Sequence, residues 1–222
     1  MLYGVVEARD NIRNRDGKRV FYLGKGDQLT SDARDFLARE RIDILPADKA
    51  RPERFKLLSG GFMEEKPERM THLFGDVLVE KTHPRIAFRG AVDSLEAELL
   101  LCAMEVPEWR SELEEILALA RQILRCEIMG QPVEQLKLCG MDPKELREKS
   151  HRPQDFFGQP HFMPQVSDGA AVLHLNRVRT AVRHTELLAV AAMPDREDIL
   201  QALNRMSSCV YILMIRQKAS LV

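Results

Sequence analysis

From Pro84 almost to the C-terminus, apolar residues recur at helical spacing, and this pattern constrains the fold more than any other feature. Phe88, Val92, Leu95 and Leu99 follow Pro84 at intervals of three or four residues, which is the spacing of one helix face. Proline suits the first turn of a helix because the N–H that it lacks would have no partner there. A helix is therefore expected to begin at Pro84.

The same spacing continues through most of the remaining chain. It predicts five helical regions, over residues 84–105, 107–130, 133–150, 168–193 and 195–217. The third region is made of shorter pieces, broken at Gly140 and restarted by Asp142-Pro143. Mostly short connections favour a mainly α protein in which residues 84–222 form a five-helix up-and-down bundle.

The N-terminal part has a different pattern. Residues 1–58 combine short β-like runs with one helix that begins near Thr30 or Ser31, which predicts a small α+β segment. Residues 59–83 begin with Ser59–Gly61 and continue through many charges. We expect this stretch to be a linker, or a loop that a ligand orders.

Bulk composition excludes several classes of protein. The formal net charge is −1, so no global field attracts nucleic acid or an anionic membrane, and no apolar run is long enough to cross a bilayer. The first ten residues lack the features of a secretory signal. Four scattered cysteines indicate free, buried thiols in a cytoplasmic protein.

Polar residues at helical spacing form three stripes that a bundle does not need. The stripes are Arg85, Arg89 and Asp93; Arg179, Arg183 and Glu186; and Asn204, Ser208 and Tyr211, with Arg205 beside the last. One interpretation is a set of surface ion pairs, each contributing only a few tenths of a kcal/mol. The alternative is a common cleft for an anion such as a triphosphate, because arginine matches phosphate oxygens.

A loop rich in aromatic residues is the second anomaly. Phe156, Phe157, Phe162 and Met163 lie between prolines and glycines. This loop either folds onto the core or forms an apolar wall for a large planar ligand. The six histidines make no metal-binding pattern, so we predict no metal site in the protein itself.

Three blocks of sequence carry a family resemblance. They are RMTHLFGDVLVEKTHPRIAFRGAVDSLEA (69–97), HFMPQVSDGAAVLHLNRVRTAVRHTELLA (161–189) and DILQALNRMSSCVYILMI (198–215). In order and spacing they resemble the ethanolamine-utilisation cobalamin adenosyltransferases, and more distantly the propanediol-utilisation ATP:cob(I)alamin adenosyltransferases. The likeness covers most of the chain.

The resemblance implies an enzyme that transfers the 5′-deoxyadenosyl group of ATP to cob(I)alamin, with Mg²⁺ accompanying the ATP. Related bundle enzymes are trimers with ATP between subunits, so a homo-oligomer is expected. Adenosylcobalamin would supply ethanolamine ammonia-lyase, and an unidentified reductase would supply electrons. The location implied is the cytoplasm, or a bacterial microcompartment within it.

The resemblance also implies roles for single residues. Phe162 would occupy the lower face of the corrin, and Asp93 would pair with Arg179. Residues expected to bind ATP are Lys81, Thr71, Arg183, Glu186, Asn204 and Arg205.

The chain departs from the family pattern at three places. EEKPERM (64–70) replaces a Gly/Thr-rich phosphate loop, which leaves Thr71 and Ser59–Gly61 as weak candidates for that task. Residues 45–70 contain no Cys or His, so the metal-binding cluster of some ethanolamine-type enzymes is predicted to be absent. Leu187 stands where the other branch has a basic residue.

Two rival functions remain at this point. A non-catalytic carrier or sensor of adenosylcobalamin would keep the Phe162 loop but would not need Lys81, Asp93, Arg179 and Asn204 together. A helical assembly protein of a microcompartment would use the charged stripes as salt bridges between subunits.

Overall fold

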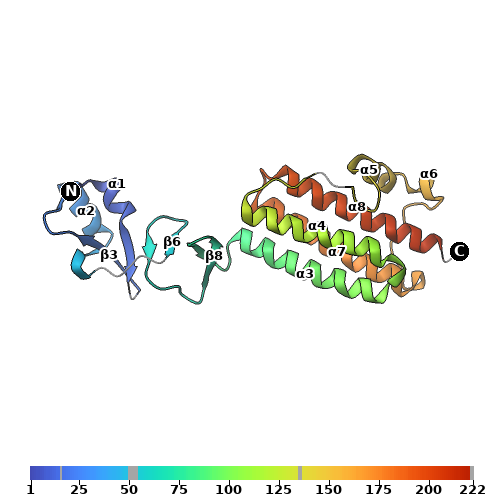
Figure 1. Cartoon of the computed structure of the whole chain (residues 1–222), viewed down its shortest axis with the longest axis horizontal. Helices are drawn as coiled ribbons and strands as arrows, with labels where there is room; N and C mark the ends of the chain where they lie inside the picture. The colour runs from blue at the N-terminus through green and yellow to red at the C-terminus, as the bar shows by residue number, and fades with distance from the viewer. Residues whose placement is uncertain (16, 50–54, 135–136, 221–222) are drawn as a thin grey trace. The chain divides into compact units, whose positions relative to one another are not determined.

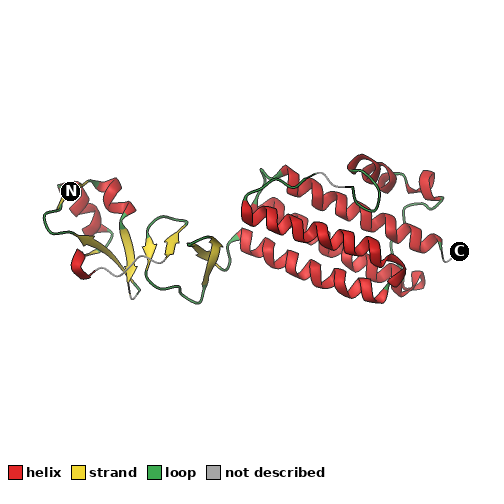
Figure 2. Cartoon of the chain, in the orientation of Figure 1, coloured by secondary structure: helices red, strands yellow, loops and turns green. Residues whose placement is uncertain are grey.

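The computed structural model describes residues 1–15, 17–49, 55–134 and 137–220. The chain divides into two compact units, Met1–His83 and Pro84–Val222 (Figure 1). Strands lie in the first unit, and the second is built from helices (Figure 2). The protein is therefore mainly α with an N-terminal α+β part, as expected.

The first unit contains two α-helices, one short 3-10 helix and nine strands among its described residues. In chain order they are β1 (Leu2–Tyr3), α1 (Val5–Asp10), β2 (Ile12–Arg15), β3 (Lys18–Leu23), β4 (Gln28–Leu29), α2 (Ser31–Arg39), β5 (Asp43–Pro46), η1 (Ala47–Lys49), β6 (Phe55–Leu57), β7 (Phe62–Met63), β8 (Met70–Phe74) and β9 (Val77–Glu80). The Thr30 hydroxyl accepts a hydrogen bond from the Ala33 N–H at 3.2 Å, so Thr30 caps α2.

Seven of these strands form one mixed sheet in the order β5-β3-β2-β7-β6-β9-β8. Antiparallel pairs β2/β3, β6/β7 and β8/β9 alternate with parallel pairs β3/β5, β2/β7 and β6/β9. Strands β1 and β4 pair separately and in parallel. The expectation that 59–83 is a linker is wrong, because β7, β8 and β9 occupy this stretch.

The glycine pair has a structural role in this sheet. Gly60 and Gly61 have φ of +93° and +87° and form the turn between β6 and β7. A Cβ on Gly61 would lie 2.9 Å from the Ile12 carbonyl oxygen, so only glycine fits here without strain. The pair is explained by the turn that joins the two strands.

The second unit contains four long helices among its described residues: α3 (Pro84–Glu105), α4 (Arg110–Met129), α7 (Gly169–Ala192) and α8 (Glu197–Ala219). Shorter helices are η2 (Pro107–Trp109), α5 (Pro143–His151), α6 (Pro153–Phe157) and η3 (Val166–Asp168). The expected five-helix bundle is not confirmed, because the third predicted region, 133–150, holds only the short helix α5 among its described residues, and α6 lies in the loop that follows it. Polar residues and prolines limit α5 and α6 to nine and five residues.

Apolar stripes hold the long helices together. Helix α7 packs against α3 and α8, α3 also packs against α4, and α5 lies on α8 (Figure 1). The predicted stripe of α3, Phe88, Val92, Leu95 and Leu99, is fully buried. Asp142 caps α5, accepting hydrogen bonds from the Lys144 and Glu145 N–H groups at 2.8 Å each, as the Asp-Pro pair predicted.

Candidate active site

The second unit contains a cavity of about 830 Å³ between α5, the segment 161–164, α7 and α8. It is lined by Ser150, His151, His161, Phe162, Met163, Pro164, Leu173, Asn176, Arg179, Arg183, Glu186, Asn204, Ser207, Ser208 and Tyr211. Five predicted site residues are among them: Phe162, Arg179, Arg183, Glu186 and Asn204.

Helical geometry explains why α7 supplies a polar wall. Arg179, Arg183 and Glu186 are spaced so that they share one face, while Val178 and Val182 are completely buried. The stripe is therefore neither a core face nor a ladder of surface ion pairs along α7. It borders a cavity.

Arg179 is the residue in this wall with the fewest polar contacts. Its Nε is buried and has no hydrogen-bond partner among the described residues. Its guanidinium lies over the Tyr211 ring, 4.9 Å from the centroid. Burial, and then repulsion by Arg183, lowers the pKa of Arg179. Two neighbouring cations, one of them partly desolvated, favour binding of an anion.

Glu186 and Asn204 join the two helices across the cavity. The Asn204 side-chain amide donates to Glu186 Oε1 at 2.9 Å. Asn204 itself is exposed, although it lines the cavity. The pair offers both donor and acceptor groups to a ligand.

Tyr211 organises the apolar end of the cavity, and the sequence did not identify it as a key residue. Its hydroxyl accepts a hydrogen bond from the Phe162 N–H at 3.3 Å and lies 3.1 Å from His161 Nδ1. Its ring stacks with those of His161 and Phe162, with centroids 5.7 and 6.1 Å apart. The stripe Asn204, Ser208 and Tyr211 was visible in the sequence, but its contact with the loop was not.

Phe162 contacts both Lys218 and Tyr211 in this arrangement. The ammonium of Lys218 makes a cation–π contact with Phe162, with Nζ 4.3 Å from the ring centroid. The contact of Phe162 with Tyr211 is a stack of two aromatic rings. Lys218 is itself fixed by an ion pair with Asp168 at 2.7 Å, which lowers the pKa of the Asp168 carboxyl. The aromatic loop packs on the core through Phe157 and Phe162, and it lines the cavity through Phe162 and Met163.

The expected ion pair between Asp93 and Arg179 is not formed in the chain. Asp93 is exposed on α3, and no ion pair of the described residues joins it to Arg179. The other two residues of its stripe have a structural role. Arg85 Nε and Arg89 Nε donate to the Glu127 carboxylate at 2.5 and 2.7 Å, and the Glu127 side chain has no exposed surface.

Lys81 and Thr71 belong to the first unit. Lys81 is exposed and forms an ion pair of 3.0 Å with Glu68. Thr71 lies in β8, where it pairs with Val79 of β9. The cavity described above is lined by residues of the second unit alone.

Arg205 also lies outside the cavity, although it follows Asn204 directly. It lines a separate, smaller pocket with residues of α4, α5 and the connection between them. The motif Asn204-Arg205 is therefore divided between two pockets.

Metal-binding clusters and membrane spans were sought in the described part of the chain. No group of three or more His, Cys, Asp or Glu residues there could hold a metal ion. None of the described helices is long and apolar enough to span a membrane. All four cysteines are free, and Cys139 Sγ lies 3.0 Å from Cys209 Sγ.

Comparison with known proteins matches most of the chain. The family described as cobalamin adenosyltransferase matches residues 62–217. The corrinoid adenosyltransferase EutT of Salmonella typhimurium (strain LT2) is 37% identical over 158 residues, and that of Escherichia coli (strain K12) is 35% identical over the same length. Each alignment covers 68% of this chain and 59% of the relative, so the match spans about three fifths of these relatives.

No solved structure matches the chain significantly. The family match covers more than half of the sequence and includes every residue that lines the cavity. On these grounds the chain belongs to the cobalamin adenosyltransferase family.

Proposed function

We propose that this protein transfers the 5′-deoxyadenosyl group of ATP to the cobalt of cob(I)alamin. The observation that carries the proposal is the cavity in which the Tyr211 ring contacts both Phe162 and Arg179, whose buried Nε has no hydrogen-bond partner among the described residues. A cationic wall suits the triphosphate, and an apolar wall suits the corrin. Family membership supports the pairing of these two substrates.

The reaction needs positioning more than it needs an activated protein nucleophile. Cobalt(I) supplies an electron pair to C5′ of ATP, the Co–C bond forms as the C5′–O bond breaks, and the triphosphate leaves with the bonding pair. The task of the protein is to hold C5′ against the cobalt, which removes an entropic barrier.

Arg179 and Arg183 are the groups we assign to the triphosphate. Their mutual repulsion is relieved when an anion binds between them, and charge-assisted hydrogen bonds are strongest where water is partly excluded. Glu186 and Asn204, already joined at 2.9 Å, are placed to hydrogen-bond the nucleoside. Asp93, Lys81 and Thr71 remain predicted contributors, and none of them lines the cavity of the second unit.

Phe162 is the group we assign to the lower face of the corrin. Reduction of Co(II) is difficult while an axial ligand is bound, and an apolar ring in that position excludes ligands. Lys218 and Tyr211 hold this ring, and the backbone N–H of Phe162 is fixed by the Tyr211 hydroxyl. The loop is therefore pre-organised for the role.

Mg²⁺ would enter with ATP, and the donor set fits that arrangement. Glu186 is the only carboxylate among the described residues that line the cavity, and its Oε1 accepts from Asn204. One carboxylate plus substrate phosphates is the usual environment of Mg²⁺ in nucleotide sites. When bound, the ion would neutralise charge on the departing triphosphate.

The wider setting follows from the ethanolamine-utilisation resemblance and is proposed on that basis. The product would supply ethanolamine ammonia-lyase, and a reductase would deliver the electron to cob(II)alamin. We further propose a homo-oligomer, trimeric or of another order, in the cytoplasm or a bacterial microcompartment.

Anaerobic incubation with chemically reduced cobalamin, ATP and Mg²⁺ tests the proposal. We expect conversion of the cob(I)alamin spectrum to that of a light-sensitive adenosyl product. A protein that binds the corrinoid without converting it is a carrier or sensor. A protein that binds neither substrate fits the assembly role, and either result refutes the enzyme.

A further inference from the structure

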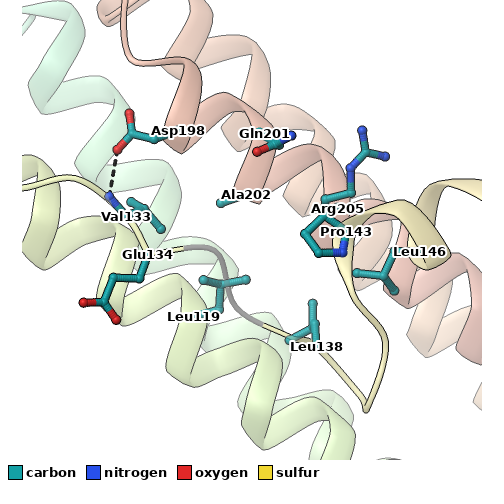
Figure 3. A pocket seen from close by; sticks show the side chains of 10 residues that line it. All are labelled: Leu119, Val133, Glu134, Leu138, Pro143, Leu146, Asp198, Gln201, Ala202 and Arg205. Atoms are coloured by element: carbon teal, nitrogen blue, oxygen red, sulfur yellow. Dashed lines mark hydrogen bonds between the residues drawn. The ribbon is translucent and has the colours of Figure 1, made fainter.

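A second pocket lies between α4, α5 and α8 (Figure 3). It shares no lining residue with the cavity. It is lined by Leu119, Val133, Glu134, Leu138, Pro143, Leu146, Asp198, Gln201, Ala202 and Arg205. Its volume is about 150 Å³. Six of the ten lining residues are apolar, and an apolar cavity of about this size holds a molecule such as benzene. One aromatic ring therefore fits it.

The charged side chains at this pocket differ in the hydrogen bonds and ion pairs that they already make within the protein. Asp198 Oδ2 accepts a hydrogen bond from the Val133 N–H at 2.8 Å (Figure 3). Asp198 also pairs with Arg196. These bonds hold the pKa of Asp198 far below its usual value, so this carboxylate is a fixed part of the wall. It is not available to a ligand.

Arg205, in contrast, has neither a hydrogen bond nor an ion pair with any residue of the described ranges. Burial and repulsion from Arg147 lower the pKa of Arg205, and attraction to Glu186 opposes this shift. An anionic group at Arg205 would offset both unfavourable terms. The pocket thus combines an apolar floor with a cation that lacks a partner.

Arg205 lines the pocket and directly follows Asn204, which lines the cavity. Glu186, which attracts it, lines the cavity. Helix α5 contributes Ser150 to the cavity and Leu146 to the pocket, so one short helix borders both. A ligand with one end in each would pass along α5 and α8 at Arg205.

We propose that this pocket, here called the tail pocket, holds the benzimidazole base of the cobalamin nucleotide tail, with the tail phosphodiester against Arg205. The inference rests on the proposed function. Exclusion of the axial base by Phe162 leaves an apolar, dimethylated ring that is otherwise exposed to water. Insertion of that ring among Leu119, Leu138 and Leu146 would favour the ligand-free cobalt.

The test compares two corrinoids that differ in the tail. Dissociation constants for cob(II)alamin and for cob(II)inamide, which lacks the nucleotide tail, are measured anaerobically with ATP present. Wild-type protein should bind cobalamin about tenfold or more tightly, the equivalent of ~1.4 kcal/mol. Ala202→Phe, which fills the tail pocket, should abolish this preference and leave cobinamide affinity unchanged. Ala118→Phe, on the exposed face of α4, should keep the preference.

The outcomes separate this inference from the function on which it rests. A wild-type protein without preference, or an Ala202→Phe variant that keeps it, overturns the tail pocket while adenosyl transfer still stands. Failure of wild-type protein to bind or convert any corrinoid refutes the proposed function itself.

A second measurement decides the matter if Ala202→Phe does not fold. Wild-type protein is titrated with free 5,6-dimethylbenzimidazole, and the methyl resonances of Leu119, Leu138 and Leu146 are followed by NMR. We expect these to shift while those of the exposed Leu187 do not, and cobalamin should compete. Unchanged resonances at the three leucines overturn the inference.

Discussion

Replacement of Arg179 by methionine should weaken ATP binding without weakening the fold. The side chain carries a buried Nε that lacks a partner, and leaving such a donor unsatisfied costs about 1–3 kcal/mol. The contact with the Tyr211 ring returns about 0.5–2 kcal/mol. The two terms nearly cancel, so the free energy of unfolding of Arg179→Met should differ from wild type by no more than ~1 kcal/mol.

The effect on ATP should be much larger. Removal of one partner from a desolvated charge pair costs roughly 2–5 kcal/mol, which is a loss in affinity of about 30-fold to several-thousand-fold. Calorimetric titration with ATP and Mg²⁺ measures this loss, and urea unfolding measures stability.

Arg177→Met is the matched control for this experiment. Arg177 lies two residues away on α7, its side chain is 64% exposed, and it pairs with Glu98 at 2.7 Å. We expect ATP affinity and stability close to wild type. Normal ATP affinity in Arg179→Met, or equal losses in both variants, would refute the assignment of Arg179 to the triphosphate.

Four further results are expected. Glu127→Gln should lower the free energy of unfolding by about 3–5 kcal/mol in urea, because it breaks a buried ion pair with two arginines. Asp198→Asn should be destabilising at neutral pH. Since the folded pKa of Asp198 is depressed below 3.8, its contribution is present above about pH 4 and should vanish as thermal unfolding is followed to lower pH. Phe162→Ala should slow reaction from cob(II)alamin roughly tenfold, the equivalent of ~1.4 kcal/mol, but barely change reaction from cob(I)alamin; equal losses would contradict exclusion of the axial ligand. Cys102, whose pKa burial raises to about 12, should resist iodoacetamide in mass spectrometry until the protein unfolds.

The parts of the fold that the sequence predicted are those with long-range periodicity. Phe88, Val92, Leu95 and Leu99 repeat over several turns of α3, so their common burial could be inferred directly. Strands β6 and β7 have only three and two residues, too few for any period to be visible. Residues 59–83 were consequently expected to be a linker, although they belong to a sheet.

Contacts between residues that are far apart along the chain could not be inferred from the sequence. Arg85 and Arg89 were visible as a charged stripe, but Glu127 lies about forty residues further along the chain, within an apolar stretch of α4. Nothing in its local pattern distinguishes a buried carboxylate from a surface one. Tyr211 was likewise placed on the correct face of α8, while its three partners come from α7 and from the loop before it.

Helix geometry also limits what a matched motif can imply. Asn204 and Arg205 are neighbours in the family pattern and were both expected to bind ATP. Consecutive residues on an α-helix point about 100° apart, so one short side chain and one long one at these positions meet different surroundings. Asn204 lines the cavity with Glu186, and Arg205 lines the tail pocket with Leu146. With Asn204 placed to hydrogen-bond the nucleoside of ATP and Arg205 placed at the tail pocket, the two neighbouring residues would contact two different ligands. The adjacency of asparagine and arginine is then explained by two adjoining binding sites rather than by one compact site.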